Sequence, residues 1–306
     1  MKRIAVLGAN SFSGAAFVAH AAAEGHEVMT LRRPFHDLNT GLDAIVGAAM
    51  DFQPDCFVNF AALNMVGESW EHFADYYRTN VIGVACLADG LRRIGCLRRF
   101  VQVSTPEVYG STDGYLSEGA PFNPSTPYAV SRAAADMHLR AQHAAHGFPV
   151  CFTRTVNVYG PGQQPYRIIP KTVLKVLRGE KLKLHGGGAS TRSFIHIRDV
   201  ARAILLVAVA GEAGADYHVA TPGTIAIRDL VGKVCGILGV RVDEVAELDA
   251  ERTGKDMAYL LADARIRALG WQEATDLDDG LAQTVAWFKE RASHYEGDSL
   301  EYRHRP

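Results

Sequence analysis

The chain has 306 residues, a formal net charge of −2 and five scattered cysteines. This length suits either one large domain or a main domain with a smaller second one. The near-neutral charge offers no basic field, so we expect no nucleic acid and no membrane as partners. No run approaches the roughly 18 apolar residues of a spanning helix, and neither a signal peptide, a disulfide framework nor a zinc motif is evident, which predicts a cytoplasmic protein without a metal.

The first half of the chain alternates short apolar runs with longer amphipathic stretches. We expect strands at residues 4–7, 28–31, 56–60, 100–104 and 150–156, and helices at residues 14–24, 42–52, 70–94 and 127–146. The strands lack polar alternation, which is typical of parallel strands covered by helices on both faces. Alternating strands and helices then predict right-handed βαβ units and a doubly wound α/β sheet.

The pattern changes after residue 160. Helices are expected at residues 168–178, 227–238, 262–269 and 277–291, with a glycine-rich turn at 186–188. No low-complexity linker separates the halves, so we expect the second half to pack directly on the first. The polar residues 293–306 predict a tail that is either peripheral or loosely ordered.

The first strand runs into a glycine-bounded turn, GANSFSG at residues 8–14, which leads into the first helix. Glycines permit close backbone approach, and a helix N-terminus can receive a pyrophosphate. The spacing resembles the G-x-x-G-x-x-G turn of short-chain dehydrogenases, with serine in place of the middle glycine; an ordinary strand–helix turn is the alternative. The candidate cofactor contacts here are Gly8, Asn10, Ser11, Phe12 and Gly14.

Two arginines, Arg32 and Arg33, follow the second strand. An acidic residue here usually binds the ribose hydroxyls of NAD, whereas an arginine suits the 2′-phosphate of NADP. The sequence therefore favours NADP, with NAD as the alternative cofactor; a solvated basic turn is the competing interpretation. Asp37 and Leu38 are candidates to flank the adenine, and Ala61, after the third strand, is a further cofactor candidate.

Two motifs carry the candidate chemistry. STPEVYG, residues 104–110, ends one strand, and YAVSR, residues 128–132, opens a later helix, so both face the ligand crevice of a doubly wound sheet. Together they resemble the active site of extended short-chain dehydrogenases in the NAD-dependent epimerase/dehydratase family, most closely nucleotide-sugar 4,6-dehydratases of the dTDP-glucose or GDP-mannose type. The likeness continues in family order through NVYGPG (157–162), IPK (169–171), RSFIHIRD (192–199), RTGKD (252–256) and LGW (269–271).

This resemblance implies a division of the chain. A dinucleotide-binding part of Rossmann type is expected at residues 1–160, with residues 192–222 returning to it. A smaller C-terminal α/β part that binds substrate is expected at residues 161–191 and 223–293, followed by a tail at 294–306. A homodimer through the helices at 70–94 and 127–146 is the family expectation.

The resemblance also implies roles for individual side chains. Tyr128 is expected to remove the proton of the sugar 4-hydroxyl as a hydride leaves carbon 4, with Thr105 holding that hydroxyl and Ser104 as a further catalytic candidate. Glu107 is expected to take the carbon-5 proton of the 4-keto intermediate, after which water leaves carbon 6 and the hydride returns there. Arg132 is expected to favour the Tyr128 phenolate and to bind the nicotinamide ribose. The purely structural alternatives are that Tyr128 is a half-buried surface tyrosine and that Glu107 caps a local turn.

Two positions depart from the family pattern. Arg132 replaces a lysine and, because it stays protonated, it does not readily relay a proton. Pro106 replaces an aspartate that could protonate the leaving water, although T-S-E variants of the family also lack that aspartate. A 4-epimerase or decarboxylase on the same scaffold is therefore the rival interpretation, and a dinucleotide sensor without catalysis is the non-enzymatic one.

A nucleotide-diphosphate sugar, the expected substrate, needs phosphate-binding groups in the crevice. By resemblance, Arg192 and Arg252 contact the diphosphate, where a guanidinium can bind two oxygens at once. Asn157 matches a side chain that contacts the sugar or diphosphate, and Pro170 is a further substrate-binding candidate. A salt bridge between the two parts is the alternative for each arginine.

Overall fold

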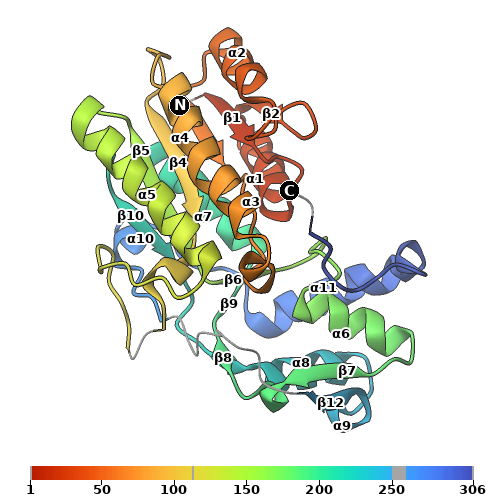
Figure 1. The fold of residues 1–306 in the computed structure, drawn as a ribbon. Helices are drawn as coiled ribbons and strands as arrows, with labels where there is room; N and C mark the ends of the chain where they lie inside the picture. Colours follow the sequence, from red (N-terminus) through yellow and green to blue (C-terminus); the bar gives the residue numbers. More distant parts are fainter. Residues whose placement is uncertain (1, 112–113, 250–259, 305–306) are drawn as a thin grey trace.

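The computed structural model describes residues 2–111, 114–249 and 260–304. Its centre is a six-stranded parallel sheet with the order β10-β5-β4-β3-β1-β2 (Figure 1). The strands are β1 (Arg3–Leu7), β2 (Glu27–Leu31), β3 (Cys56–Asn59), β4 (Arg99–Ser104), β5 (Val150–Thr155) and β10 (Asp216–Val219). The expected doubly wound α/β fold is therefore confirmed.

Successive side chains of each strand enter two separate hydrophobic cores, one on each face of the sheet. Ile4 of β1 packs with α1 (Phe12–Ala23) and α7 (Ile197–Ala210), whereas the next residue, Ala5, packs with helices of the opposite face. Those helices are α2 (Leu42–Phe52), α4 (Val84–Leu91) and α5 (Pro127–His146). Burial on both faces explains why the strands are apolar throughout.

The region expected as one helix at 70–94 divides into η1 (Gly67–Trp70), α3 (Phe73–Tyr77), the π-helical η2 (Arg78–Gly83) and α4. Its two interior glycines have a packing reason. A Cβ on Gly83 would lie 2.9 Å from Leu38 Cβ, and one on Gly90 would lie 2.5 Å from Val46 Cγ2. Close contact with α2 and the loop before it thus offsets the low helix propensity of glycine.

α7 and β10 were not predicted from the sequence. Nine residues of α7 are buried, and its run AILLVAVA is apolar on nearly every side. A signal was nevertheless available, because Arg198 and Arg202 are four residues apart and lie on the less buried side of the helix. β10 pairs in parallel with β5 and extends the sheet, so the chain returns to the first part after crossing the second. The residue limits of the two parts stay a prediction.

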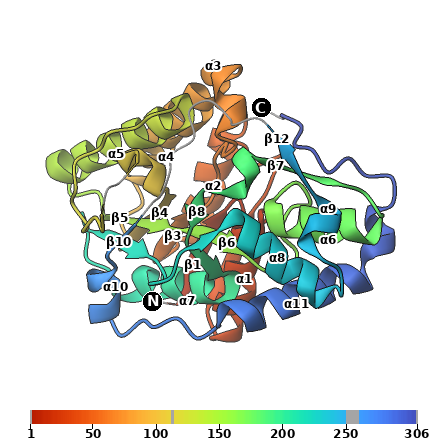
Figure 2. The ribbon, with the colours of Figure 1, turned by 90° about the horizontal axis from the view of Figure 1, so that it is seen from below.

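A second, smaller group of elements lies beside the sheet (Figures 1 and 2). α6 (Ile168–Leu177), α8 (Ile227–Ile237) and α11 (Leu277–Glu290) surround a third hydrophobic core. Strand pairs connect or flank them: β6 (Asn157–Tyr159) with β9 (Phe194–His196), β7 (Leu182–His185) with β12 (Ala246–Asp249), and β8 (Thr191–Arg192) with β11 (Ile225–Ala226). The short elements are η3 (Pro106–Tyr109), η4 (Gly186–Gly188), α9 (Val242–Val245), α10 (Ala264–Ala268) and η5 (Ala292–Tyr295). Within the described ranges, no helix combines the length and apolar character needed to cross a membrane.

The C-terminal tail is packed against the rest of the molecule. Leu300 is 5 % exposed and belongs to the third hydrophobic core. At residue 304 the described chain reaches the start of α3, where the ring of His304 stacks on that of His72, the residue before that helix. The expectation of a loosely ordered tail is therefore wrong for residues 300–304, because their side chains find partners on both parts of the molecule.

Candidate functional site

A cavity of about 630 Å³ lies where β1, β3, β4 and β5 end, between the sheet and the second group of elements. The carboxyl ends of parallel strands meet at one edge of a sheet, and ligands of doubly wound folds bind at that edge. The structure brings many of the expected site residues together here. The expected residues that line the cavity are Ser11, Phe12, Ser104, Thr105, Glu107, Tyr128, Arg132, Asn157 and Arg192.

The start of α5 fixes the position of Tyr128. Thr126 caps the helix by accepting a hydrogen bond from the Ala129 amide at 3.2 Å, and Pro127 occupies the first turn. Tyr128 follows at once and is only 6 % exposed. The cap, the proline and burial together hold the phenol at the cavity wall.

The electrostatics of Tyr128 oppose its ionisation. Burial, reinforced by the negative charge of Glu107, raises the pKa of Tyr128 to about 12. Arg132 and a side-chain hydrogen bond with Thr105 act in the opposite direction without overcoming the rise. The expected effect of Arg132 is therefore present, but it does not bring the pKa of Tyr128 below its ordinary value.

The turn after β4 places Thr105 and Glu107. The Thr105 hydroxyl accepts a hydrogen bond from the Glu107 amide at 3.4 Å and begins η3, in which Pro106 is the first residue. Proline suits the first position of a helical turn, so the residue that departs from the family pattern has a local structural role. The Ser104 hydroxyl donates to Asp136 Oδ2 at 2.6 Å and thus faces the protein interior beneath the cavity.

Arg132 lies one turn after Tyr128 on α5 and is 2 % exposed. Its guanidinium donates to the Val103 carbonyl, while its Nε has no hydrogen-bond partner among the described residues. A buried donor without a partner is unfavourable by about 1–3 kcal/mol. An oxygen of a ligand bound in the cavity, such as a ribose hydroxyl, fits this position.

The turn after β1 forms another wall of the cavity. Gly8 has φ +77°, and a Cβ there would lie 2.9 Å from the Ala61 amide nitrogen; a Cβ on Gly14 would clash with the Gly8 carbonyl. Ser11, in place of the middle glycine, accepts a hydrogen bond from the Gly14 amide at 3.1 Å and begins α1. This close backbone packing at the start of a twelve-residue helix fits a dinucleotide pyrophosphate.

The remaining cofactor candidates lie outside the main cavity. Asn10 lines an adjoining hollow of about 340 Å³. Arg33 Nε forms an ion pair with Asp37 Oδ2 at 2.5 Å, whereas Arg32 is exposed. Leu38 is buried. An internal ion pair thus engages two of the residues that were expected to contact the adenosine half of the cofactor.

Some of the substrate candidates line the main cavity and others do not. Asn157 Nδ2 donates to a main-chain carbonyl at 3.2 Å and Arg192 Nη1 to another at 2.8 Å, and both side chains line the cavity. Pro170 is buried in α6 and is not among the lining residues, although its neighbour Lys171 is. Arg252 lies outside the described residues.

The cavity also contains side chains that the sequence analysis did not single out as site residues, among them Tyr166, Arg167 and His185. A signal was available, because the cations at 167 and 171 are four residues apart at the start of α6 and so share one side. Among the described lining residues, five Arg and Lys side chains accompany a single carboxylate, that of Glu107. This excess of positive charge favours a polyanionic ligand. The five cations are Arg132, Arg167, Lys171, Lys183 and Arg192.

Comparisons with known proteins agree with this geometry. A model of the NAD dependent epimerase/dehydratase family matches residues 4–220. A dTDP-glucose 4,6-dehydratase of Streptomyces griseus is 38 % identical over 244 residues, which is 79 % of this chain and 74 % of that protein. A trifunctional UDP-glucose 4,6-dehydratase/UDP-4-keto-6-deoxy-D-glucose 3,5-epimerase/UDP-4-keto-L-rhamnose-reductase of Arabidopsis thaliana is 35 % identical over 76 % of this chain. The chain spans only 36 % of the length of that plant relative.

A solved structure extends the likeness over the whole fold. DesIV, a dTDP-glucose 4,6-dehydratase from Streptomyces venezuelae crystallised with NAD and TYD bound, matches with a TM-score of 0.89 and 32 % identity. The match covers 96 % of this chain and 99 % of that one. The chain belongs to the NAD-dependent epimerase/dehydratase family. The expected family is thereby confirmed, whereas the activity and the roles of single site residues stay predictions.

Proposed function

We propose that the protein is a nucleotide-sugar 4,6-dehydratase, which acts with a nicotinamide dinucleotide through a transient 4-keto intermediate. The proposal depends chiefly on the meeting of Tyr128, Thr105 and Glu107 at one cavity rich in cationic side chains. The similarity to DesIV and to the Streptomyces griseus enzyme supports dehydration over the rival 4-epimerisation or decarboxylation. The further activities named for the plant relative lie outside the proposal.

The first half of the proposed reaction oxidises carbon 4. When bound, the dinucleotide supplies a ring that accepts the hydride of carbon 4 and later returns it to carbon 6. Thr105 holds the 4-hydroxyl, and Tyr128 as phenolate removes its proton while the ketone forms. The positive charge of Arg132 favours that phenolate against the opposing effects of burial and of Glu107.

The second half eliminates water. The 4-ketone makes the carbon-5 proton acidic, and the Glu107 carboxylate is placed by resemblance to take it. Pro106 cannot protonate the leaving oxygen, and Glu107 is the sole carboxylate among the described lining residues. We therefore assign both steps to Glu107: it takes the proton from carbon 5 and gives it to the hydroxyl that leaves carbon 6 as water. As the hydride returns to carbon 6, carbon 5 takes up a proton, and the proton that Tyr128 removed from the 4-hydroxyl balances it.

Product mass tests the reaction. The protein is incubated with dTDP-glucose, UDP-glucose, GDP-mannose and a nucleotide-linked hexuronic acid, and the products are measured by mass spectrometry. Dehydration lowers the mass of the sugar by one water, epimerisation leaves it unchanged, and decarboxylation removes carbon dioxide. A turned-over substrate of unchanged mass would refute the dehydratase and favour the epimerase.

Tyr128→Phe tests the proposed base. We expect the rate of turnover to fall by roughly 10²–10⁴-fold, as for loss of a general base, while dinucleotide binding is retained. Tyr115→Phe is the matched control, because Tyr115 is 59 % exposed and is not one of the lining residues. If Tyr128→Phe turns over substrate like the control, Tyr128 is not the base.

The choice between NADP and NAD depends on the residues after β2. DesIV was crystallised with NAD, whereas the exposed Arg32 in this chain favours the additional phosphate of NADP. Arg32→Ala should weaken NADP binding about tenfold, by loss of a charge-assisted contact, and leave NAD affinity unchanged. Equal affinities of both cofactors for the variant and the parent would remove Arg32 from the cofactor site.

The proposed homodimer and cytoplasmic location stay predictions. Ile82 and Met137 are 59 % and 61 % exposed and lie on the two helical regions expected at the dimer interface. A dimeric mass by light scattering that becomes monomeric in Met137→Glu would support this interface.

A further inference from the structure

Residues 300–304, which we call the C-terminal strap, cross from the second group of elements to α3. Glu301 Oε1 forms an ion pair with Lys171 Nζ at 2.6 Å. The ring of Tyr302 meets that of Tyr166 edge-on, with 5.2 Å between centroids. Lys171 and Tyr166 both line the cavity, so the strap contacts side chains that form its wall.

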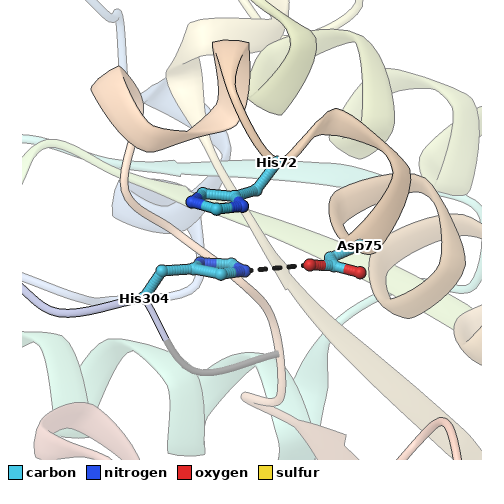
Figure 3. Close-up of side chains that lie close together, drawn as sticks. All are labelled: His72, Asp75 and His304. Atoms are coloured by element: carbon cyan, nitrogen blue, oxygen red, sulfur yellow. Dashed lines mark hydrogen bonds and ion pairs between the residues drawn. The ribbon is translucent and has the colours of Figure 1, made fainter.

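The strap reaches α3 through His304 (Figure 3). His304 Nε2 lies 3.1 Å from Asp75 Oδ2, and its ring stacks on that of His72 with 4.0 Å between centroids and 5° between planes. The three side chains are close enough together to suggest a metal site. However, an imidazole nitrogen directs its lone pair in the plane of its ring, so two parallel stacked rings do not aim at one ion. The cluster is therefore a packed contact that anchors the end of the strap.

The ring of Tyr76 connects this anchor to the proposed base. Tyr76 stacks toward His304 at 6.0 Å and meets Tyr128 edge-on at 6.2 Å. Its side chain is fully buried, and its hydroxyl donates to the Met65 carbonyl at 2.7 Å. Because Tyr76 is enclosed in this way, His304 and Tyr128 both contact one buried ring that has little freedom to move.

We propose that His304 and Tyr302 are positioning residues, which hold Tyr128 and Tyr166 in place while the sugar is at the 4-keto stage. The proposal rests on the proposed function, since it concerns the same cavity. Oxidation of carbon 4 moves a hydride to the dinucleotide and a proton to Tyr128. If the ketone escapes at that point, the sugar leaves oxidised and the dinucleotide stays reduced, so the catalytic cycle is not completed. The strap joins α6, which contributes to the cavity wall, to α3, which contacts Tyr128 through Tyr76, and this connection opposes the escape.

His304→Ala in the full chain tests the proposal, with His294→Ala as the matched control. His294 is an exposed histidine of the same tail, outside the strap. Loss of one aromatic contact should lower the rate of dehydration about three- to tenfold. In addition, free 4-keto sugar and reduced dinucleotide should accumulate in His304→Ala, followed by mass spectrometry and by absorbance of the reduced nicotinamide. His294→Ala should behave like the parent.

A rescue variant separates positioning from folding. His304→Phe keeps a ring against Tyr76 but loses the contact with Asp75, so we expect it to restore most of the dehydration rate. Tyr302→Ala should shift the outcome in the same direction as His304→Ala. A slower His304→Ala that releases no 4-keto sugar, or that His304→Phe does not rescue, overturns the positioning role.

Two measurements do not require turnover. With dTDP and UDP as probes, the nucleotide should dissociate faster from His304→Ala than from the parent. Amide hydrogen exchange at residues 73–77 should also be faster in the variant, because α3 loses its anchor. If the parent makes no dehydrated product, the proposed function fails; if nucleotide dissociation and exchange are both unchanged in His304→Ala, the strap proposal fails.

Discussion

The two halves of α5 carry polar side chains along one face but place them in different surroundings. Tyr128, Arg132, Asp136 and Arg140 are spaced four residues apart, so they lie one above another on the helix. The first two line the cavity. The last two enter an ion-pair network in which Asp136, Arg154 and Asp216 are buried and Arg140 borders solvent.

The enclosed half is internally compensated. Arg154, which is fully buried, pairs with Asp136 at 2.7 Å and also with Asp216, and Asp216 is paired in turn with Arg140. Burial raises the pKa of Asp136, although Arg154 opposes that rise. At Asp216 burial also acts to raise the pKa, but Arg154 and Arg140 outweigh it and the pKa is lowered. Arg154 and Arg140 therefore stabilise the charge of Asp216, whereas at Asp136 the effect of burial is reduced by Arg154 but not overcome.

The open half lacks such compensation. Within the described part of the chain, no carboxylate lies within ion-pair distance of Arg132, and the pKa of Tyr128 is raised to about 12. One helix face thus serves structure where protein covers it and is available to a ligand where it borders a cavity. Charge alone does not distinguish the two uses, but enclosure does.

The largest effect should come from the enclosed half. Arg154→Met leaves two buried carboxylates without their shared cation, and breaking a buried pair in this way is expected to lower the free energy of unfolding by about 3–5 kcal/mol. Urea denaturation followed by circular dichroism measures it. Arg140→Met is the control, with a smaller loss expected because its side chain is 37 % exposed. A change below about 1 kcal/mol for Arg154→Met would contradict the contrast between the halves.

Arg132→Met should lower turnover strongly and change stability little, the opposite of Arg154→Met. Its loss removes the charge that lowers the pKa of Tyr128, so we expect turnover to fall about 100-fold while stability stays close to that of the parent. Arg132→Lys keeps the charge and should retain most of the activity. Steady-state kinetics beside urea denaturation measure both quantities. A large loss of stability with Arg132→Met would place this residue in the structural half instead.

The contrast within α5 marks what could be predicted from the sequence. The limits of α5 agree with the helix expected at residues 127–146, and the structure shows Thr126 capping its start and Gly147 following its end. The pairing of Asp136 with Arg154 could not be predicted, because it depends on the register of β5 beneath the helix. The strap was missed because aromatic residues in a short polar tail carry no periodicity.

Ser104 lines the cavity and also donates a hydrogen bond to the buried Asp136, so it borders both halves of α5. Ser104→Ala should have a moderate effect on stability. Its hydroxyl donates to Asp136 at 2.6 Å, so its removal deprives a buried carboxylate of a donor and should lower stability by about 1–2 kcal/mol. Turnover should change little if Ser104 serves the network. Thermal denaturation and kinetics on the same preparation compare the two. A strong loss of turnover at unchanged stability would instead support the catalytic role expected from the resemblance.

Glu107→Gln should have the smallest of these effects, and it should raise the rate of the first chemical step instead of lowering it. The Glu107 charge raises the pKa of Tyr128, so its removal lowers that pKa. A base acts when deprotonated, and the rate of carbon-4 oxidation rises with pH toward the pKa of Tyr128. Lowering that pKa moves the rising limb to lower pH, so reduced dinucleotide should form a few-fold faster at neutral pH. Stopped-flow absorbance measures this step alone, separately from the dehydration that the variant loses; a limb shifted to higher pH would show that Glu107 does not act on Tyr128 through its charge.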